Sequence, residues 1–250
     1  MTQRQFVQGG FSLLELAIVL FIVALLAGSM LPAVSARQNA MEQAAVRQQL
    51  DDIREALLGF AIRYGRLPCP AAPGSSGGES PENGGNCSHP WNGLLPAITL
   101  GIQPVDSKGY AVDPWGNPIR YAVSTFKNAT CGSAPCLTSE DGLRHSWNSE
   151  TPPAPDLHVC NAAAGASGSG GSAECASGST LNREAVAVFF STGRNGGREP
   201  AGADEIANRN NTRLFVAHAA NAAPNEFDDE VDWLSPNIFY SRLLAAGRLP

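Results

Sequence analysis

The feature that most constrains this chain is an apolar run near its N-terminus. Residues 13–31 read LLELAIVLFIVALLAGSML, and Glu15 is the only ionisable side chain among them. A helix needs about 20 apolar residues to cross a bilayer, so the run predicts a membrane-spanning helix. A carboxylate inside hydrocarbon costs roughly 2.5–3.5 kcal/mol at the bilayer centre and less near an end. Glu15 is therefore expected to have a partner and a function.

An ordinary secretory signal is one explanation of this run. Such a signal has a basic n-region, an apolar core and a cleavage site of small residues. Here Arg4 is the only basic residue before the run, and Val34-Ser35-Ala36 would be the cleavage site. The glutamate inside the apolar core and the length of that core both argue against this explanation.

The residues at the start of the run favour a different explanation. Residues 10–15 read GFSLLE and, with the apolar run that follows, they closely resemble the type IV prepilin signature. This family comprises type IV pilins, type II secretion pseudopilins and competence pseudopilins. The resemblance implies that prepilin peptidase, a membrane aspartic peptidase, cleaves after Gly10 on the cytoplasmic side. Phe11 would then be N-methylated, and Glu15 would be the fifth residue of the mature protein.

Elementary electrostatics agrees with this position of Glu15. Cleavage leaves a positive amine at Phe11, and the helix dipole favours a carboxylate near the start of a helix. The resemblance implies that Glu15 of one subunit neutralises the Phe11 amine of a neighbour. An unpaired Glu15 would penalise misaligned packing, so its charge would set the axial register of an assembly. The alternative is a glutamate that snorkels to the membrane surface.

A second helical segment is expected after Pro32, which predicts a kink at the end of the apolar run, as in many members of the family. Residues 12–64 are thus expected to form one long helix in two halves. In the second half an apolar stripe recurs every three to four positions, and it predicts a face that packs on a sheet or, alternatively, on a partner helix. The stripe consists of Leu50, Ile53, Leu57, Phe60 and Tyr64.

The chain is expected to contain a leader peptide (1–10), a transmembrane and assembly helix (11–31), an amphipathic helix that continues into the head (32–66) and a globular head (67–250). The expected fold class is α+β and pilin-like: a long N-terminal helix, transmembrane in its first half, packs on an antiparallel β-sheet head with long disulfide-stapled loops. Residues 185–192, AVAVFFST, are the clearest strand.

A second motif points to the same family. Residues 113–121 read DPWGNPIRY, which resembles the D-x-W-G-x-P-h-x-Y segment of the major pseudopilin of type II secretion, where it leads into the β-sheet of the head. By composition the first six of these residues form a turn, and the last residues begin a strand. The alternative is a generic Pro/Gly turn with a packed tryptophan.

The cysteines indicate how the head is stabilised. All six lie downstream of the apolar run, in stretches rich in glycine, serine and proline. None forms a CxxC pair, and no His–Cys spacing suits zinc. In an exported head they are expected to form disulfides. Among the connectivities that six cysteines allow, we expect the sequential pairs Cys69–Cys87, Cys131–Cys136 and Cys160–Cys175.

An acidic segment near the C-terminus is a candidate metal site. Asp228, Asp229, Glu230 and Asp232 lie within five positions, and Ca²⁺ binds clustered carboxylate and carbonyl oxygens. Major pseudopilins resemble this chain in having a calcium-stabilised loop near the C-terminus, which implies Asp228, Asp229 and Asp232 as calcium ligands. The segment does not match an EF-hand, and a solvated acidic turn is the alternative. No other cofactor is expected.

Charge and motifs exclude other classes of protein. The net charge is −6 and there is no long basic run, which argues against general nucleic-acid binding; a role in DNA uptake would be the exception. The sequence contains no P-loop and no GxGxxG, HExxH or GxSxG motif, and its four histidines are scattered. An enzyme is not expected.

These observations predict a structural subunit, either a pseudopilin or a minor pilin, of a type IV pilus-like or type II secretion filament. Its expected location is the inner membrane, with a single span, a cytoplasmic N-terminus and a periplasmic head that is extracellular in a pilus. Its expected partners are other pilin or pseudopilin subunits, prepilin peptidase, the inner membrane and an assembly platform. The alternative is a membrane-anchored or secreted binding module that is not part of a filament.

Overall fold

The computed structural model of the protein describes residues 12–147, 153–168, 170–200, 202–222 and 225–249. The predicted cleavage point at Gly10 and Phe11 lies outside the described residues. The chain divides into two compact units, Met1–Ala45 and Val46–Pro250. Each is considered by itself below.

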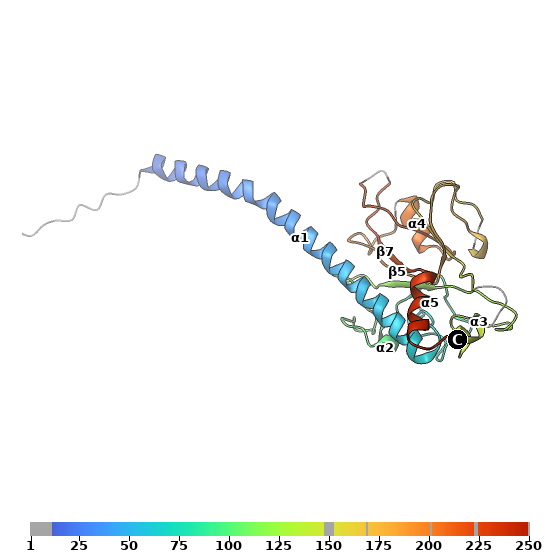
Figure 1. Cartoon of the computed structure of the whole chain (residues 1–250). Helices are drawn as coiled ribbons and strands as arrows, with labels where there is room; N and C mark the ends of the chain where they lie inside the picture. Colours follow the sequence, from blue (N-terminus) through green and yellow to red (C-terminus); the bar gives the residue numbers. More distant parts are fainter. Residues whose placement is uncertain (1–11, 148–152, 169, 201, 223–224, 250) are drawn as a thin grey trace, which may run out of the picture. The chain divides into compact units, whose positions relative to one another are not determined.

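Helix α1 runs from Leu13 to Tyr64 and provides the described helical residues of the first unit (Figure 1). The Ser12 hydroxyl accepts a hydrogen bond from the Leu14 amide at 3.3 Å, as expected at a helix start. The helical backbone continues through Pro32. At the other end, Gly65 adopts the left-handed conformation (φ 66°) that closes many helices.

The prediction that the apolar first half of this helix spans a membrane requires a correction. In the part of the chain that the structure describes, no helix is both long enough and apolar enough to cross a membrane. The expected pilin-like fold class, with a first half that spans the membrane over residues 11–31, is therefore wrong. The expected single-pass location in the inner membrane is wrong for the same reason.

The head contains two sheets instead of the one antiparallel sheet that was expected. The strand order of the first sheet is β1-β2-β5-β7, and every neighbouring pair is antiparallel. In the second, of order β4-β3-β6, the pair β3–β6 is parallel. Parallel strands need a long crossover, and the segment between Cys160 and Leu214 provides it. The strands are β1 (Gly93–Leu94), β2 (Arg120–Val123), β3 (Leu157–Cys160), β4 (Thr180–Ala185), β5 (Ala187–Ser191), β6 (Leu214–Val216) and β7 (Glu230–Leu234).

Short helices complete the head. They are α2 (Ala97–Leu100), α3 (Gly142–Trp147), the 3-10 helix η1 (Gly170–Ser172), α4 (Ala203–Arg209) and α5 (Pro236–Ala245). The Ser235 side chain caps α5, and Pro236 occupies its first turn. Figure 1 shows α5 beside the last turns of α1, where Arg248 donates to the Arg63 carbonyl at 2.8 Å.

The core lies between the second half of α1 and the first sheet. Leu50, Ile53 and Leu57 of the predicted stripe are buried, in one cluster with residues of β2, β5, β7 and α5. Phe60 is also buried, whereas Tyr64 is 49% exposed and contacts Phe60 in a tilted arrangement with ring centroids 4.4 Å apart. Strand β5, inside the predicted range 185–192, is buried along its whole length, because Phe189 packs in the cluster with α1 while Val188 and Phe190 pack in a second cluster.

Local chemistry in the loops explains how the sheet begins and how the loops are held. In the segment DPWGNPIRY, the Asp113 carboxylate accepts from the amides of Trp115 (3.0 Å) and Asn117 (2.8 Å) and from the Ser191 hydroxyl at 2.6 Å. This turn leads directly into β2 and fastens it to β5. Disulfides join the three sequential pairs expected from the sequence, which are Cys69–Cys87, Cys131–Cys136 and Cys160–Cys175.

The packing of α1 on the sheet predicts a large stability effect at Leu57, which is fully buried. Leu57→Ala should lower the free energy of unfolding by about 2–5 kcal/mol, because it removes buried methyl groups and leaves a cavity. The matched control is Leu244→Ala in α5, where the leucine is 43% exposed and the loss should be much smaller. Urea denaturation of the full chain measures both. Equal losses at the two positions would contradict this packing.

Candidate metal centre

Strand β7 separates the carboxylates of the acidic segment into two groups. Successive side chains of a strand point to opposite faces. Glu230 and Asp232 face α1, where Arg47 donates to Glu230 at 3.1 Å and Arg54 forms an ion pair with Asp232. Asp232, an expected calcium ligand, is therefore engaged by an arginine.

Asp228 and Asp229, just before β7, meet a third carboxylate that the sequence analysis did not find. Glu205 of α4 joins them, and one carboxylate oxygen from each of the three residues lies within 4.8 Å of the others. Glu205 and Asp229 are buried, and Asp228 is half-buried. The structure thus brings together two of the three expected ligands and replaces the third with Glu205.

Close backbone contacts place α4 beside this segment. The Ala203 amide donates to the Asn225 side chain at 3.0 Å. A Cβ on Gly202, the residue before the helix, would lie 2.2 Å from the Glu226 carbonyl oxygen, so only glycine permits this approach. The start of α4 is therefore held next to the residues that lead into Asp228.

One oxygen of each carboxylate is hydrogen-bonded. Glu205 Oε1 accepts from the Asn195 side-chain amide at 2.8 Å and from the Asp228 amide at 3.2 Å. Asp228 Oδ2 accepts from the Asn195 backbone amide at 3.2 Å. Asp229 Oδ2 accepts from the Asn208 side chain at 2.8 Å. These bonds fix the three carboxylates in position.

The remaining oxygens have no donor. Glu205 Oε2, Asp228 Oδ1 and Asp229 Oδ1 are buried and make no hydrogen bond to any residue that the structure describes, and neither does the side-chain oxygen of Asn195. Buried polar atoms without a partner are rare and call for an explanation. The three clustered carboxylates could hold a hard cation, and Asn195, which bonds Glu205, lies beside them.

Burial gives the cluster an unusual charge balance. It raises the pKa of Asp229 to about 7, because a buried carboxylate loses its hydration; the Asn208 hydrogen bond opposes this rise, and the nearby Glu205 adds to it. Burial is also the main cause that raises the pKa of Asp228, with a further contribution from Glu205. Arg209 is the cation whose charge lowers the pKa of Asp229. The charge of Asp229 also acts on Arg120 of β2, so the three carboxylates have two arginines in their electrostatic surroundings.

The loop after β5 closes the cluster and depends on the DPWGNPIRY turn. Gly193 has φ 65°, and a Cβ there would lie 2.1 Å from Asp228 Oδ1. The Asn117 side chain donates to the Gly193 carbonyl at 2.7 Å. Asn117 therefore positions the loop that carries Asn195 over the acidic residues.

The chemistry of this site suits Ca²⁺ or Mg²⁺. All the candidate ligand atoms are oxygens, which hard cations prefer, and nitrogen or sulfur ligands of the kind that zinc selects are not among them. Glu205 and Asn195 escaped the sequence analysis because neither stands at a ligand spacing from Asp228 and Asp229: Glu205 lies in the short helix α4, and Asn195 lies in a glycine-rich loop. The other predicted functional residue that the structure describes, Glu15, is exposed on α1.

No family model, no curated protein and no solved structure matches this chain. The resemblance to prepilins therefore rests on the residues of its two motifs.

Occupation of this site should stabilise the head. Ca²⁺ at about 100 times its dissociation constant should raise the free energy of unfolding by about 2.7 kcal/mol relative to chelator, because only the folded chain assembles the ligands. Glu205→Gln should abolish that increment. Glu230→Gln, in the same acidic segment but paired with Arg47, is the matched control and should retain it. An unfolding curve that neither Ca²⁺ nor Mg²⁺ shifts would refute the assignment.

The raised pKa of Asp229 predicts a pH dependence in chelator. A carboxyl group whose folded pKa is raised stabilises the fold most below its unfolded pKa, and this contribution is lost as pH rises through the folded value of about 7. Relative to Asp229→Asn, the wild-type chain should therefore lose stability between about pH 4 and pH 7. Ca²⁺ should reverse the trend, since it binds the ionised form. If the free energies of unfolding of the two proteins in chelator changed with pH in parallel, the raised pKa of Asp229 would be contradicted.

Proposed function

We propose that this chain is a structural subunit of a filament, a pseudopilin or minor pilin, that assembles through its N-terminal helix. In this proposal prepilin peptidase cleaves the chain after Gly10, and Phe11 is N-methylated. The observation that carries the proposal is the exposure of the apolar side chains in the first turns of α1.

These apolar side chains surround the helix. Each of the following is at least half exposed: Leu13, Leu14, Leu16, Ile18, Val19, Leu20, Phe21, Ile22, Val23, Leu25 and Leu26. Because they occupy nearly consecutive positions, they cover every side of the helix and not one stripe. A helix that is apolar all round needs partners on all sides. The same segment of other copies of this chain supplies them in a helical assembly.

Glu15 is the charged group in this apolar surface, and it supports an assembly of defined register. It is the only ionisable side chain of residues 13–26, and it is exposed. In a packed bundle of such helices a carboxylate without a partner is costly, because water is excluded. A neighbour shifted so that its Phe11 amine meets Glu15 removes that cost, and other shifts do not.

The disulfides of the head suit an oxidising compartment better than the reducing cytosol. Three disulfides close its loops, and such bonds persist in oxidising compartments. The candidate metal centre would add stability to the same head. Both features suit a subunit that displays its head on the outside of a filament.

The proposal predicts the outcome of one substitution. In Glu15→Leu, cleavage after Gly10 should persist, but filament yield should fall by at least about tenfold, because a buried charge that loses its partner costs about 3–5 kcal/mol. Glu55→Leu, the same change at an exposed site later in α1, is the control and should assemble normally. Electron microscopy and quantification of sheared filaments measure the yield.

Mass spectrometry of the mature N-terminus separates this proposal from a secreted binding module. A methylated Phe11 is the expected result. A mature chain that starts at Arg37 would contradict the proposal, and so would filaments of normal abundance from Glu15→Leu.

A further inference from the structure

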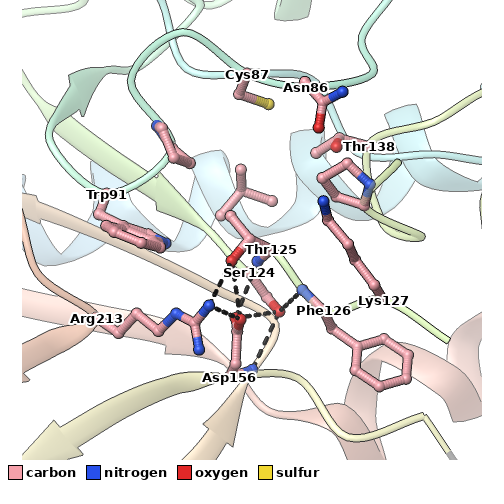
Figure 2. Close-up of a pocket in the computed structure, with 13 residues that line it drawn as sticks. Asn86, Cys87, Trp91, Ser124, Thr125, Phe126, Lys127, Thr138, Asp156 and Arg213 are labelled. Atoms are coloured by element: carbon pink, nitrogen blue, oxygen red, sulfur yellow. Dashed lines mark hydrogen bonds and ion pairs between the residues drawn. The ribbon is translucent and has the colours of Figure 1, made fainter. Parts of the chain in front are cut away.

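A cavity of about 580 Å³ lies in the head, away from the candidate metal centre. Its walls come from the loop before β1, from the residues that follow β2 and from the residues just before β3 and β6 (Figure 2). A volume of this size suits a small ligand. The polar side chains that matter for its chemistry are Asn86, Trp91, Thr125, Lys127, Asp156 and Arg213.

Two disulfides hold the walls in place. Cys87 lines the cavity and is bonded to Cys69. The opposite loop is closed by Cys131–Cys136, and within it the Ser133 carbonyl accepts from the Lys127 ammonium at 2.6 Å. The cavity is therefore largely preformed, which lowers the ordering cost of binding.

The acidic group of the cavity is already satisfied. Asp156 Oδ1 accepts from the Ser124 hydroxyl (2.6 Å) and the Thr125 amide (2.9 Å). Asp156 Oδ2 accepts from the Thr125 hydroxyl at 2.9 Å and forms an ion pair with Arg213 at 3.1 Å. Figure 2 shows these bonds converging on the carboxylate. Asp156 thus has no free acceptor capacity to attract a cation.

Some hydrogen-bond donors of the lining, by contrast, remain without an acceptor in the part of the chain that the structure describes. Arg213 stacks on Trp91, with its guanidinium carbon 5.1 Å from the ring centroid. The Trp91 indole nitrogen and Arg213 Nε have no acceptor among the described residues. Lys127 is exposed, and its ammonium has donors to spare beyond Ser133. With Asp156 set against Lys127 and Arg213, the lining has a net charge of +1.

We propose that this cavity binds the carboxylate-bearing ring of an acidic sugar. Lys127 and the donors of Trp91 and Arg213 recognise the carboxylate, whose oxygens accept charge-assisted hydrogen bonds. Asn86 bonds a ring hydroxyl, and the flat apolar surfaces of the lining cover the C–H face of the ring. The proposal does not depend on filament assembly, because every group it uses belongs to the head.

The choice of a sugar over a peptide follows from the rest of the lining. The Asn86 side-chain amide, which suits a ligand hydroxyl, belongs to the same lining as the cationic groups, and prolines and the indole supply flat apolar faces. Among the described lining residues there is no second carboxylate to bind the amide nitrogens of a peptide backbone. The carboxylate end of a peptide is therefore treated as an outcome of the test.

Calorimetric titration of the full chain with glucuronate and with glucose tests the proposal, because these sugars share a ring and differ in the carboxylate. Glucuronate should bind at least about tenfold more tightly, the effect of one charge-assisted hydrogen bond. Lys127→Gln should lose that preference. The chain has only one other lysine, the exposed Lys108, and Lys108→Gln is the matched control that should keep it. Trp91→Phe, which keeps a ring but removes the N–H, should weaken glucuronate binding.

Three results would overturn the proposal. The first is equal binding of glucuronate and glucose, or binding of neither by the wild-type chain. The second is an unchanged affinity for glucuronate in Lys127→Gln. The third is that trialanine with a free C-terminal carboxylate binds as tightly as glucuronate, whereas trialanine with an amidated C-terminus does not bind. That result would assign the cavity to peptide C-termini.

Discussion

The packing of the second half of α1 against β7 is the interaction on which the rest of the head depends. It buries Ile53 and Leu57 in the same core as Phe189 and Leu234, and it pairs Glu230 and Asp232 of β7 with arginines of α1. Once Asp232 faces Arg54, the alternation of the strand turns Asp229 toward α4. One acidic segment therefore provides both the ion pairs of the helix and the carboxylates of the candidate metal centre.

The metal centre has a strong physical requirement of its own. Three ionised carboxylates that share a buried site need compensating positive charge, and Arg209 and Arg120, which both interact with Asp229, supply two charges. The raised pKa of Asp229 shows one solution, which is to bind a proton. A divalent cation would be another solution, and it would also provide a partner for the oxygens that have no donor.

Some of this structure could be predicted from the sequence because the signal was local. The stripe at Leu50, Ile53 and Leu57 follows the helical period, and short loops rich in glycine favour sequential disulfides. Contacts between distant segments left no such signal. The residues around Asp232 do not indicate its ion pair with Arg54, and those around Asp228 do not indicate its proximity to Glu205. The parallel pair β3–β6 likewise joins strands that a long crossover separates in the sequence. The membrane span was inferred from the apolar composition of one segment, and the described helix does not meet the length and apolarity that a span needs.

The metal centre and the cavity are connected through a single short strand. Asn208 of α4 bonds Asp229 and also bonds the amide and carbonyl of Val216 in β6, at 2.7 and 3.0 Å. Arg213, which directly precedes β6, carries the guanidinium that binds Asp156 and stacks on Trp91. A cation that fixes Asp229 therefore also fixes one end of β6, and the other end of the same strand places the arginine of the cavity.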